Sequence, residues 1–403
     1  MTLPIALPLG DRRRSLIQLV DSTYRVALRE GLVTDRPGLA SGLAGALVFV
    51  TECCVQGYGF ASRQHASELA NRLVEMAAEV NMPHHFGDGL AGVLYALRYA
   101  GTHLIPGVVP DLSDVDCFLK ESLTSGALDH YNYDFMVGPV GIGAYALSMP
   151  DTPLKAELLG AVVDWLWRTS TTVDGHIGWL TAEERKADEK GRPAGFNLGV
   201  AHGLPGVAAL LAGARQCVES QLAAELLDSL LDTLNVAQRA TSVSLYPYRF
   251  GDLEEQCSRL AWCYGDAGIA GAFLYAARFD ARFRKLGISA ATRAAAHPEA
   301  KAYVVDAPFC HGSAGLVAIF SRVAQVTGDA RFADSAAKWL RRLVDGYVAD
   351  AEGLQELRYY EPKRKSFVDL NPGVLIGVSG IGLAAMLALR PDVCTWKELF
   401  FLP

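Results

Sequence analysis

The feature that most constrains this chain is a motif, Gly-x-x-Gly followed by an apolar run, that recurs seven times in 403 residues. The first glycines of successive copies are 47 to 65 residues apart, enough each time for two helices and their connections. The longer intervals also leave room for an inserted loop. The repeat therefore predicts seven helix pairs that fill the chain, with copies that begin at Gly42, Gly89, Gly138, Gly203, Gly265, Gly312 and Gly377.

The segments that follow the glycine pairs have the pattern of buried helices. Apolar residues recur there at helical spacing, as at Leu204, Val207 and Leu211, and charges are few on any face. The segments between the repeats differ, because a leucine stripe runs through 222–234 while acidic residues fall outside the stripe. The sequence therefore predicts seven inner helices that are buried on all faces and seven outer helices that each have one solvent-exposed face.

This alternation, without a strong strand pattern, fits either an open helical solenoid or a closed double ring. An open solenoid needs polar caps, whereas the first and last glycine pairs are as apolar as the middle ones. We therefore predict an all-α fold, an α/α toroid, as a single domain over residues 1–403. Three segments, 169–196, 241–251 and 350–371, interrupt the helical rhythm and are predicted to be loops or small hairpins.

The composition excludes several classes of protein. Half of the chain, 51%, is hydrophobic and 20% is charged, which predicts a large core rather than a disordered chain. A net charge of −7 with scattered basic residues predicts no nucleic-acid binding. Eight cysteines are too few for a disulfide scaffold, so we expect a reducing, cytoplasmic location. The longest uncharged stretch, 370–389, contains Asn371-Pro372-Gly373 and is predicted to be a loop and a buried helix rather than a membrane span.

Cysteine and histidine side chains stand directly before three of the glycine pairs. Cys263 precedes the fifth pair, Cys310 and His311 precede the sixth, and His202 precedes the fourth. In a closed ring these equivalent positions come to one mouth, where the side chains can converge on one ion. Two thiolates and an imidazole are ligands that zinc prefers, and three protein ligands leave a position open for substrate. The alternative is that these are ordinary core residues. Their register against the repeats favours one zinc ion per chain.

Charged side chains near the same mouth are candidates for assisting a reaction. Asp134 precedes the third glycine pair by four residues, and Arg259 precedes Cys263 by four. Together with His202, they would supply proton transfer and stabilise a developing negative charge. Taken singly, a surface aspartate and a salt-bridged arginine are the simpler interpretations.

Together these motifs resemble those of the lanthionine synthetase C-like proteins, the cyclases of class I lantibiotic biosynthesis. The resemblance covers essentially the whole chain and rests on the seven glycine pairs and on Trp262-Cys263-Tyr264-Gly265, Cys310-His311-Gly312 and Ala201-His202-Gly203. It implies a seven-fold α/α barrel with one zinc ion at its mouth. The residues that it implies are Cys263, Cys310 and His311 as zinc ligands, His202 and Asp134 as an acid/base pair, and Arg259 and Tyr264 as supporting residues.

The resemblance also implies a reaction. A cysteine of a dehydrated precursor peptide adds to a dehydroalanine or dehydrobutyrine of the same peptide and closes a thioether ring. Zinc keeps a bound thiol deprotonated, Arg259 would stabilise the enolate oxygen, and His202 would donate a proton to the α-carbon. Asp134 would orient His202 or take the thiol proton. The expected partners are the precursor peptide and, in a synthetase complex at the membrane, a dehydratase and a transporter.

Two other functions fit the same motifs. A relative that adds glutathione, as eukaryotic members of the family do, would place a small thiol on the same zinc ion. A non-catalytic scaffold would hold a precursor peptide for a dehydratase and a transporter. A scaffold needs no open metal site, so the intact set of Cys263, Cys310, His311 and His202 argues against it.

Overall fold

In a computed structural model of the chain, the described residues are 9–10, 12–181, 183–186, 195–239, 243–251, 258–349 and 357–403. This part of the chain contains fourteen α-helices and four short strands, which confirms the predicted all-α class. The chain divides into two compact units. Unit 1 comprises Met1–Pro83, Gly87–Asp111 and Val304–Thr395, and unit 2 comprises His84–Phe86, Leu112–Tyr303 and Trp396–Pro403. The single domain over 1–403 stays a prediction.

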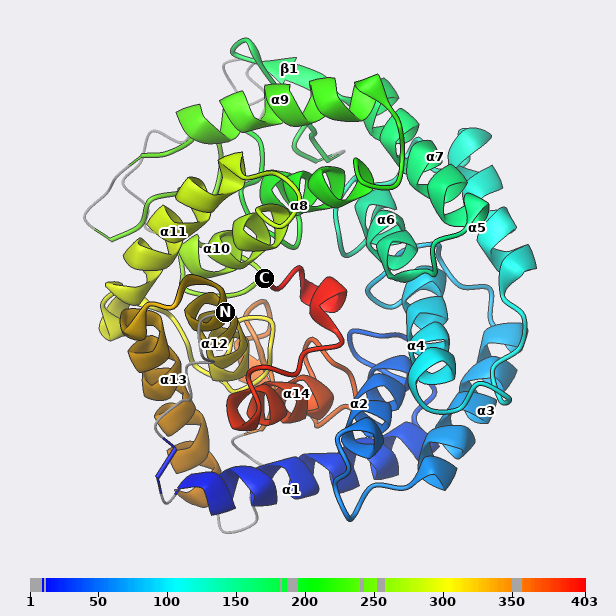
Figure 1. Cartoon of the computed structure of the whole chain (residues 1–403), viewed down its shortest axis with the longest axis vertical. Coiled ribbons are helices and arrows are strands. Elements are labelled where there is room, and N and C mark those ends of the chain that lie inside the picture. Colours follow the sequence, from blue (N-terminus) through cyan, green and yellow to red (C-terminus); the bar gives the residue numbers. More distant parts are fainter. Residues whose placement is uncertain are drawn as a thin grey trace. The chain divides into compact units, whose positions relative to one another are not determined.

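Unit 1 consists of two layers of helices, which Figure 1 shows, and of one hairpin. The helices that follow a glycine pair are α2 (Leu43–Val55), α4 (Leu90–His103), α12 (Ser313–Thr327) and α14 (Val378–Leu389). They pack in the order α4, α2, α14, α12. Against them pack α1 (Arg12–Val33), α3 (Arg63–Glu79) and α13 (Ala330–Ala349). Strands β3 (Tyr360–Glu361) and β4 (Ser366–Phe367) pair antiparallel in the segment before α14.

Unit 2 repeats this arrangement (Figure 1). The helices after a glycine pair are α6 (Pro139–Ser148), α8 (Leu204–Ala214) and α10 (Asp266–Ala276), and α8 packs between the other two. The helices between repeats are α5 (Ser113–Thr124), α7 (Pro153–Thr169), α9 (Gln221–Val236) and α11 (Arg282–Ala295). Strands β1 (Thr171–Val173) and β2 (His176–Gly178) form an antiparallel hairpin against α9, and the 3-10 helices are η1 (Glu299–Lys301) and η2 (Lys397–Phe400).

The two kinds of helix differ in burial as the sequence predicts. Every residue of α8 and of α10 is buried. Helix α9 instead buries one stripe, which includes Leu226, Leu230 and Leu234, and exposes its acidic residues. A buried leucine truncated to alanine typically costs about 2 to 5 kcal/mol, so these stripes hold each outer helix in place. The predicted seven inner and seven outer helices are therefore confirmed in the described residues.

The glycine pairs are required because a loop lies against the start of each inner helix. A Cβ atom at Gly265 would collide with the carbonyl oxygen of Arg259, and one at Gly268 with that of Trp262. In both cases the carbonyl belongs to the residue six positions earlier, and the same relation recurs in the first, third, fourth, sixth and seventh repeats. Gly265 also has a positive φ of 87°, which a side chain would strain. Each loop therefore folds back over the first helical turn and places its side chains at that end of the helix.

The three predicted insertions contain little regular structure. The hairpins β1–β2 and β3–β4 lie in the first and the third, and the second contains an isolated bridge between Arg249 and Asn197. Residues 182, 187–194, 241–242 and 350–356 of these insertions lie outside the described residues.

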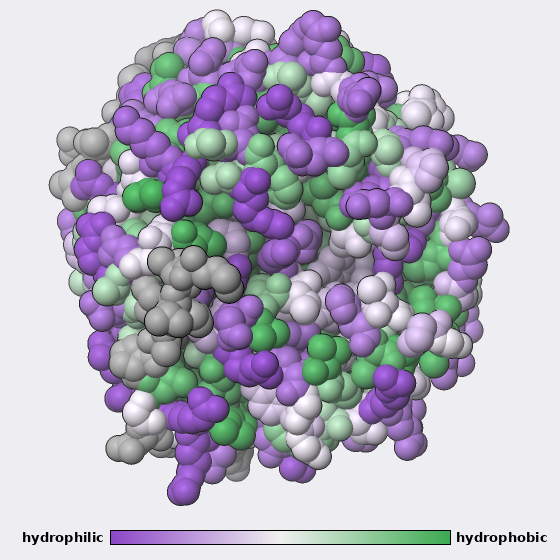
Figure 2. Space-filling model, in the orientation of Figure 1, coloured by the Kyte–Doolittle hydropathy of each residue, from purple (hydrophilic) through white to green (hydrophobic). Residues whose placement is uncertain are grey.

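The surface carries both hydrophilic and hydrophobic residues. Figure 2 shows hydrophilic and hydrophobic residues interspersed over the face in view. Within the described ranges, no helix combines the length and the hydropathy that crossing a membrane requires.

Candidate functional site

Five of the seven predicted site residues lie in unit 2, on the loops that lead into α6, α8 and α10. Asp134 lies four residues before Gly138, and His202 lies one residue before Gly203. Arg259, Cys263 and Tyr264 lie on the loop that ends at Gly265. Because α8 packs between α6 and α10 and each loop covers the start of its helix, the three loops meet at one end of these helices.

Asp134 and His202 form a hydrogen-bonded pair. The Oδ2 atom of Asp134 lies 3.1 Å from Nδ1 of His202, and its Oδ1 atom accepts hydrogen bonds of 2.8 Å from the backbone N–H groups of Met136 and Val137. An aspartate whose oxygens are occupied in this way fixes the ring, with Nδ1 as the donor and Nε2 left for a substrate. The hydroxyl of Tyr133 donates to the backbone carbonyl of His202 at 2.9 Å, which holds the loop.

The environment of His202 favours its protonated form. Its side chain is 41% exposed, whereas that of Asp134 is 1% exposed. Burial lowers the pKa of His202, but the hydrogen bond and the negative charge of Asp134 outweigh this effect and raise the pKa above its ordinary value of 6.5. His202 is therefore equipped to donate a proton near neutral pH.

Cys263 lies on a loop that is anchored at both sides. Its backbone carbonyl accepts from the N–H of Ala201 at 3.4 Å, which joins its loop to that of His202. The neighbouring Trp262 donates from its indole Nε1 to the carbonyl of Phe400 in η2 at 3.0 Å. Cys263 is buried, with 6% of its surface exposed. These contacts fix the thiol at the end of the three helices, beside His202.

Tyr264 and Arg259 are held on the same loop by hydrogen bonds. The amide Nδ2 of Asn197 donates to Oη of Tyr264 at 2.7 Å. Burial raises the pKa of Tyr264 against the lowering effect of this hydrogen bond, so the hydroxyl keeps its hydrogen at neutral pH. The Arg259 guanidinium donates to the carbonyl of Tyr303 at 3.1 Å, and its backbone N–H donates to the Tyr248 hydroxyl at 2.9 Å. No carboxylate among the described residues forms an ion pair with Arg259, so its charge can act on an anionic ligand.

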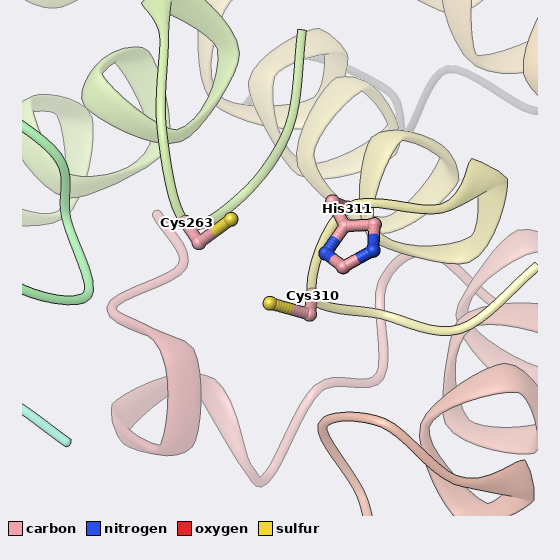
Figure 3. Close-up of side chains that lie close together, drawn as sticks. All are labelled: Cys263, Cys310 and His311. Atoms are coloured by element: carbon pink, nitrogen blue, oxygen red, sulfur yellow. The ribbon is translucent and has the colours of Figure 1, made fainter. Parts of the chain in front are cut away.

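Cys310 and His311 lie in unit 1, on the loop before α12. Figure 3 draws them with Cys263, which comes from the loop before α10. His311 is 3% exposed, and its Nε2 lies 3.3 Å from the carbonyl oxygen of Tyr360 and 3.4 Å from Oδ2 of Asp306. Both of these groups are acceptors, so Nε2 carries the hydrogen and Nδ1 carries the lone pair that a metal ligand needs.

Two residues of these loops were not among the predicted site residues. Asp306 accepts from the backbone N–H of Tyr360 at 2.9 Å and lies beside His311, and Asn197 holds Tyr264. Each lies six residues before the first glycine of its repeat, where Asn132 and Asn371 also stand. This recurrence of Asn or Asp at one register position is the sequence signal that could have found them.

The chain is similar to a known family and to solved structures. A model of the family described as lanthionine synthetase C-like protein matches residues 33–401. Nisin cyclase is 17% identical, with a TM-score of 0.71 over 97% of each chain. A sugar epimerase from a ruminal bacterium is 11% identical, with a TM-score of 0.45 over 93% of this chain and 99% of that chain. No curated protein matches in sequence. The likeness to nisin cyclase confirms the predicted α/α toroid fold.

Proposed function

The chain belongs to the lanthionine synthetase C-like family, and from this premise we propose that it is a zinc-dependent peptide cyclase. Its substrate is a dehydrated precursor peptide, in which a cysteine thiol adds to a dehydroalanine or dehydrobutyrine and closes a lanthionine or methyllanthionine ring. The observation that carries this proposal is the pair of Asp134 and His202, whose loop is joined to that of Cys263.

The chemistry of the donor set fits one zinc ion. Among the described residues, Cys263, Cys310 and His311 are the group whose ligand atoms could hold a metal (Figure 3). Two thiols and one imidazole match the preference of zinc, and three protein ligands leave a position for a substrate thiol. Asp306 and the carbonyl of Tyr360 fix the tautomer of His311 in which Nδ1 is the ligand. When zinc is bound there, it supplies the chemistry of the reaction by keeping the substrate thiol deprotonated.

His202 completes the addition as the proton donor. The substrate sulfur forms a bond to the β-carbon, the electron pair of the double bond moves toward the carbonyl oxygen, and the α-carbon then takes a proton. Asp134 holds Nδ1 of His202, so the N–H at Nε2 of the protonated ring is the one that can be donated. The raised pKa of His202 keeps a larger fraction of the ring protonated at neutral pH.

Arg259 and Tyr264 stabilise the negative charge that develops on the carbonyl oxygen. The Arg259 guanidinium is oriented by a backbone carbonyl, and the Tyr264 hydroxyl retains its hydrogen. Groups that are oriented before the reaction need no reorganisation when the charge appears, which makes them effective in catalysis. The assembly of this cyclase with a dehydratase and a transporter at the membrane, and its cytoplasmic location, form part of the proposal.

The first test measures zinc per chain and ring closure for the wild type, Cys310→Ala and the control Cys217→Ala. We expect about one zinc per chain and thioether formation on a dehydrated peptide for the wild type and Cys217→Ala. Cys310→Ala should lose most of the zinc and the activity, because two ligands hold zinc more weakly than three. Full folding without metal in the wild type would contradict the proposal, and thioether formation with glutathione alone would favour the glutathione-adding relative.

A further inference from the structure

The side chain of Asn197 forms hydrogen bonds with two parts of unit 2, the backbone at Gly199 and the side chain of Tyr264. Its Oδ1 accepts from the backbone N–H of Gly199 at 2.8 Å, and its Nδ2 donates to Oη of Tyr264 at 2.7 Å. Its backbone carbonyl accepts from the N–H of Leu204, at the start of α8. Asn197 is 6% exposed, so these hydrogen bonds are shielded from water. The carboxamide therefore joins the loop of His202 to the side chain of Tyr264.

The direction of the hydrogen bond to Tyr264 follows from the partner at the other end. The backbone N–H of Gly199 can only donate, so the atom of Asn197 that faces it is the carbonyl oxygen. The atom that faces Tyr264 is then the amide nitrogen, which can only donate. Oη of Tyr264 is consequently the acceptor, and its own hydrogen points away from Asn197.

The ring of Tyr264 has little freedom to change this arrangement. It packs against the backbone of Gly199 so closely that a Cβ atom there would collide with it. On another side, the ring of Tyr248 lies with its centroid 5.5 Å away at an interplanar angle of 59°. In the described part of the chain, Asn197 is the one residue that forms a hydrogen bond with the Tyr264 hydroxyl. Within the described residues, the hydroxyl hydrogen therefore has no acceptor and is available to a bound ligand.

We propose that Asn197 is a positioning residue that makes the Tyr264 hydroxyl a hydrogen-bond donor toward the reacting peptide. The acceptor is the carbonyl oxygen of the dehydroalanine or dehydrobutyrine, on which negative charge develops during the addition. A hydroxyl that accepts one hydrogen bond is polarised and becomes a stronger donor in the next. This inference rests on the proposed cyclase function.

The test uses Asn197→Asp, which has almost the same shape as the wild-type side chain. One carboxylate oxygen still accepts from Gly199, but the other now accepts from Tyr264 and turns the hydroxyl hydrogen away from the substrate. We expect kcat to fall roughly 100-fold, as on removal of one oriented donor, with KM changed less than about threefold and zinc content unchanged. In a Tyr264→Phe background, Asn197→Asp should have no further effect on kcat.

Asn371→Asp is the matched control. Asn371 occupies the same register position before Gly377, and its Oδ1 also accepts from a glycine two residues later, at 3.1 Å. Its Nδ2, however, donates to the backbone carbonyl of Ile376 at 3.1 Å, so no hydroxyl is redirected. We expect kcat for this variant to stay within about twofold of the wild type.

Asn197→Ala separates a directional role from a merely structural one. Alanine removes both hydrogen bonds of the side chain, so a structural role predicts a larger loss of kcat than in Asn197→Asp. The directional role predicts the reverse order, because alanine leaves the Tyr264 hydrogen free. A larger loss in Asn197→Ala, or an equal effect of Asn197→Asp in the Tyr264→Phe background, would overturn the proposal.

A spectroscopic readout tests the hydrogen bond without any substrate. The Raman doublet of tyrosine depends on whether the hydroxyl accepts or donates, and subtraction of the Tyr264→Phe spectrum isolates this residue. We expect an acceptor signature in the wild type and a donor signature in Asn197→Asp, and identical signatures would refute the proposed direction. If the wild type closed no ring, the proposed function would fail, and the Raman comparison would still decide the direction of the bond.

Discussion

In the described residues of each unit, a histidine is held by an aspartate, and the two aspartates, Asp134 and Asp306, hold opposite nitrogens of the imidazole ring. In unit 2, Asp134 binds Nδ1 of His202, whose side chain is 41% exposed. In unit 1, Asp306 lies at Nε2 of His311, whose side chain is 3% exposed. In the proposed mechanism, the exposed ring of His202 presents Nε2 to the substrate, whereas the buried ring of His311 keeps Nδ1 for the metal ion.

In the proposed mechanism, one kind of aspartate–histidine pair serves two kinds of chemistry. The loops are built alike, since each folds back over the first turn of an inner helix and each histidine lies one residue before a glycine. A proton donor needs a raised pKa and access to the substrate, whereas a metal ligand needs a fixed neutral tautomer. On this proposal, the nitrogen that is held and the exposure of the ring determine the role of each histidine, and the shared loop does not.

The largest expected effect comes from truncating the two histidines separately. His202→Ala should lower kcat roughly 10²- to 10⁴-fold and keep its zinc, because it removes a proton donor and no ligand. His311→Ala should lose zinc as well as activity. Zinc per chain and single-turnover rates check this, with Ser41→Ala, one residue before Gly42, as a control that keeps kcat within about twofold. Equal loss of zinc in both histidine variants would remove the distinction between the two pairs.

A smaller effect is expected for Asp306→Asn. The amide cannot accept a charge-assisted hydrogen bond from His311, so the ring is oriented less firmly, and the dissociation constant for zinc should rise roughly 10- to 100-fold. Competition with a chromophoric chelator measures this constant. Asp134→Asn is the matched control in the other unit and should leave zinc affinity unchanged. An unchanged affinity in Asp306→Asn would show that the aspartate does not act on the ligand.

The pH dependence of kcat should change in Asp134→Asn, the variant that served as the control for zinc affinity. Asp134 raises the pKa of His202, so Asp134→Asn should lower it. If protonated His202 is the donor, the rate falls as the pH rises through this pKa, and the fall should begin at lower pH in Asp134→Asn than in the wild type. Profiles measured at saturating zinc and peptide test this shift. A fall that moved to higher pH, or did not move, would argue against His202 as the acid.

The smallest expected effect concerns stability. Because the pKa of His202 is raised in the folded protein, its protonated form contributes stability below pH 6.5, and this contribution is lost as the pH rises through the raised value. The side chain is 41% exposed, so solvent screening limits the contribution to less than about 1 kcal/mol. Denaturant titrations of the wild type and His202→Gln should therefore differ below pH 6.5 and converge at higher pH. A difference in the free energy of unfolding that grew with pH would contradict a raised pKa of His202 in the folded protein.

The sequence predicted the helices well because their cause is local. A glycine pair is needed wherever a carbonyl lies against the first helical turn, so each inner helix begins directly after its first glycine, as α8 does at Leu204. The same register predicted that Asp134 and His202 lie at the ends of inner helices, and α6 and α8 are neighbours. Neither prediction depends on contacts between distant parts of the chain.

The hydrogen-bond partners of His311 and Tyr264 could not be predicted from local sequence patterns, unlike the starts of the inner helices. The pairing of Asp306 with Tyr360 depends on the β3–β4 segment, an insertion with no periodic pattern. Which nitrogen of His311 is held follows from that segment as well, because the carbonyl of Tyr360 is one of the two acceptors. The role of Asn197 depends on the path of the loop that carries Tyr264. Side-chain direction at these positions is therefore a property of the folded loops.

The hydrogen bond from Trp262 to the carbonyl of Phe400 also limits how early during synthesis the loop of Cys263 can complete its packing. The two residues are 138 positions apart, so the ribosome must add all the residues between them before the loop of Cys263 can reach its final packing. At roughly 5 to 20 residues per second, this interval lasts on the order of 10 seconds. During that time the loop of Cys263 lacks its contact with η2. A nascent chain thus contains Cys263 and Trp262 for some seconds before the loop that carries them can take up its final packing.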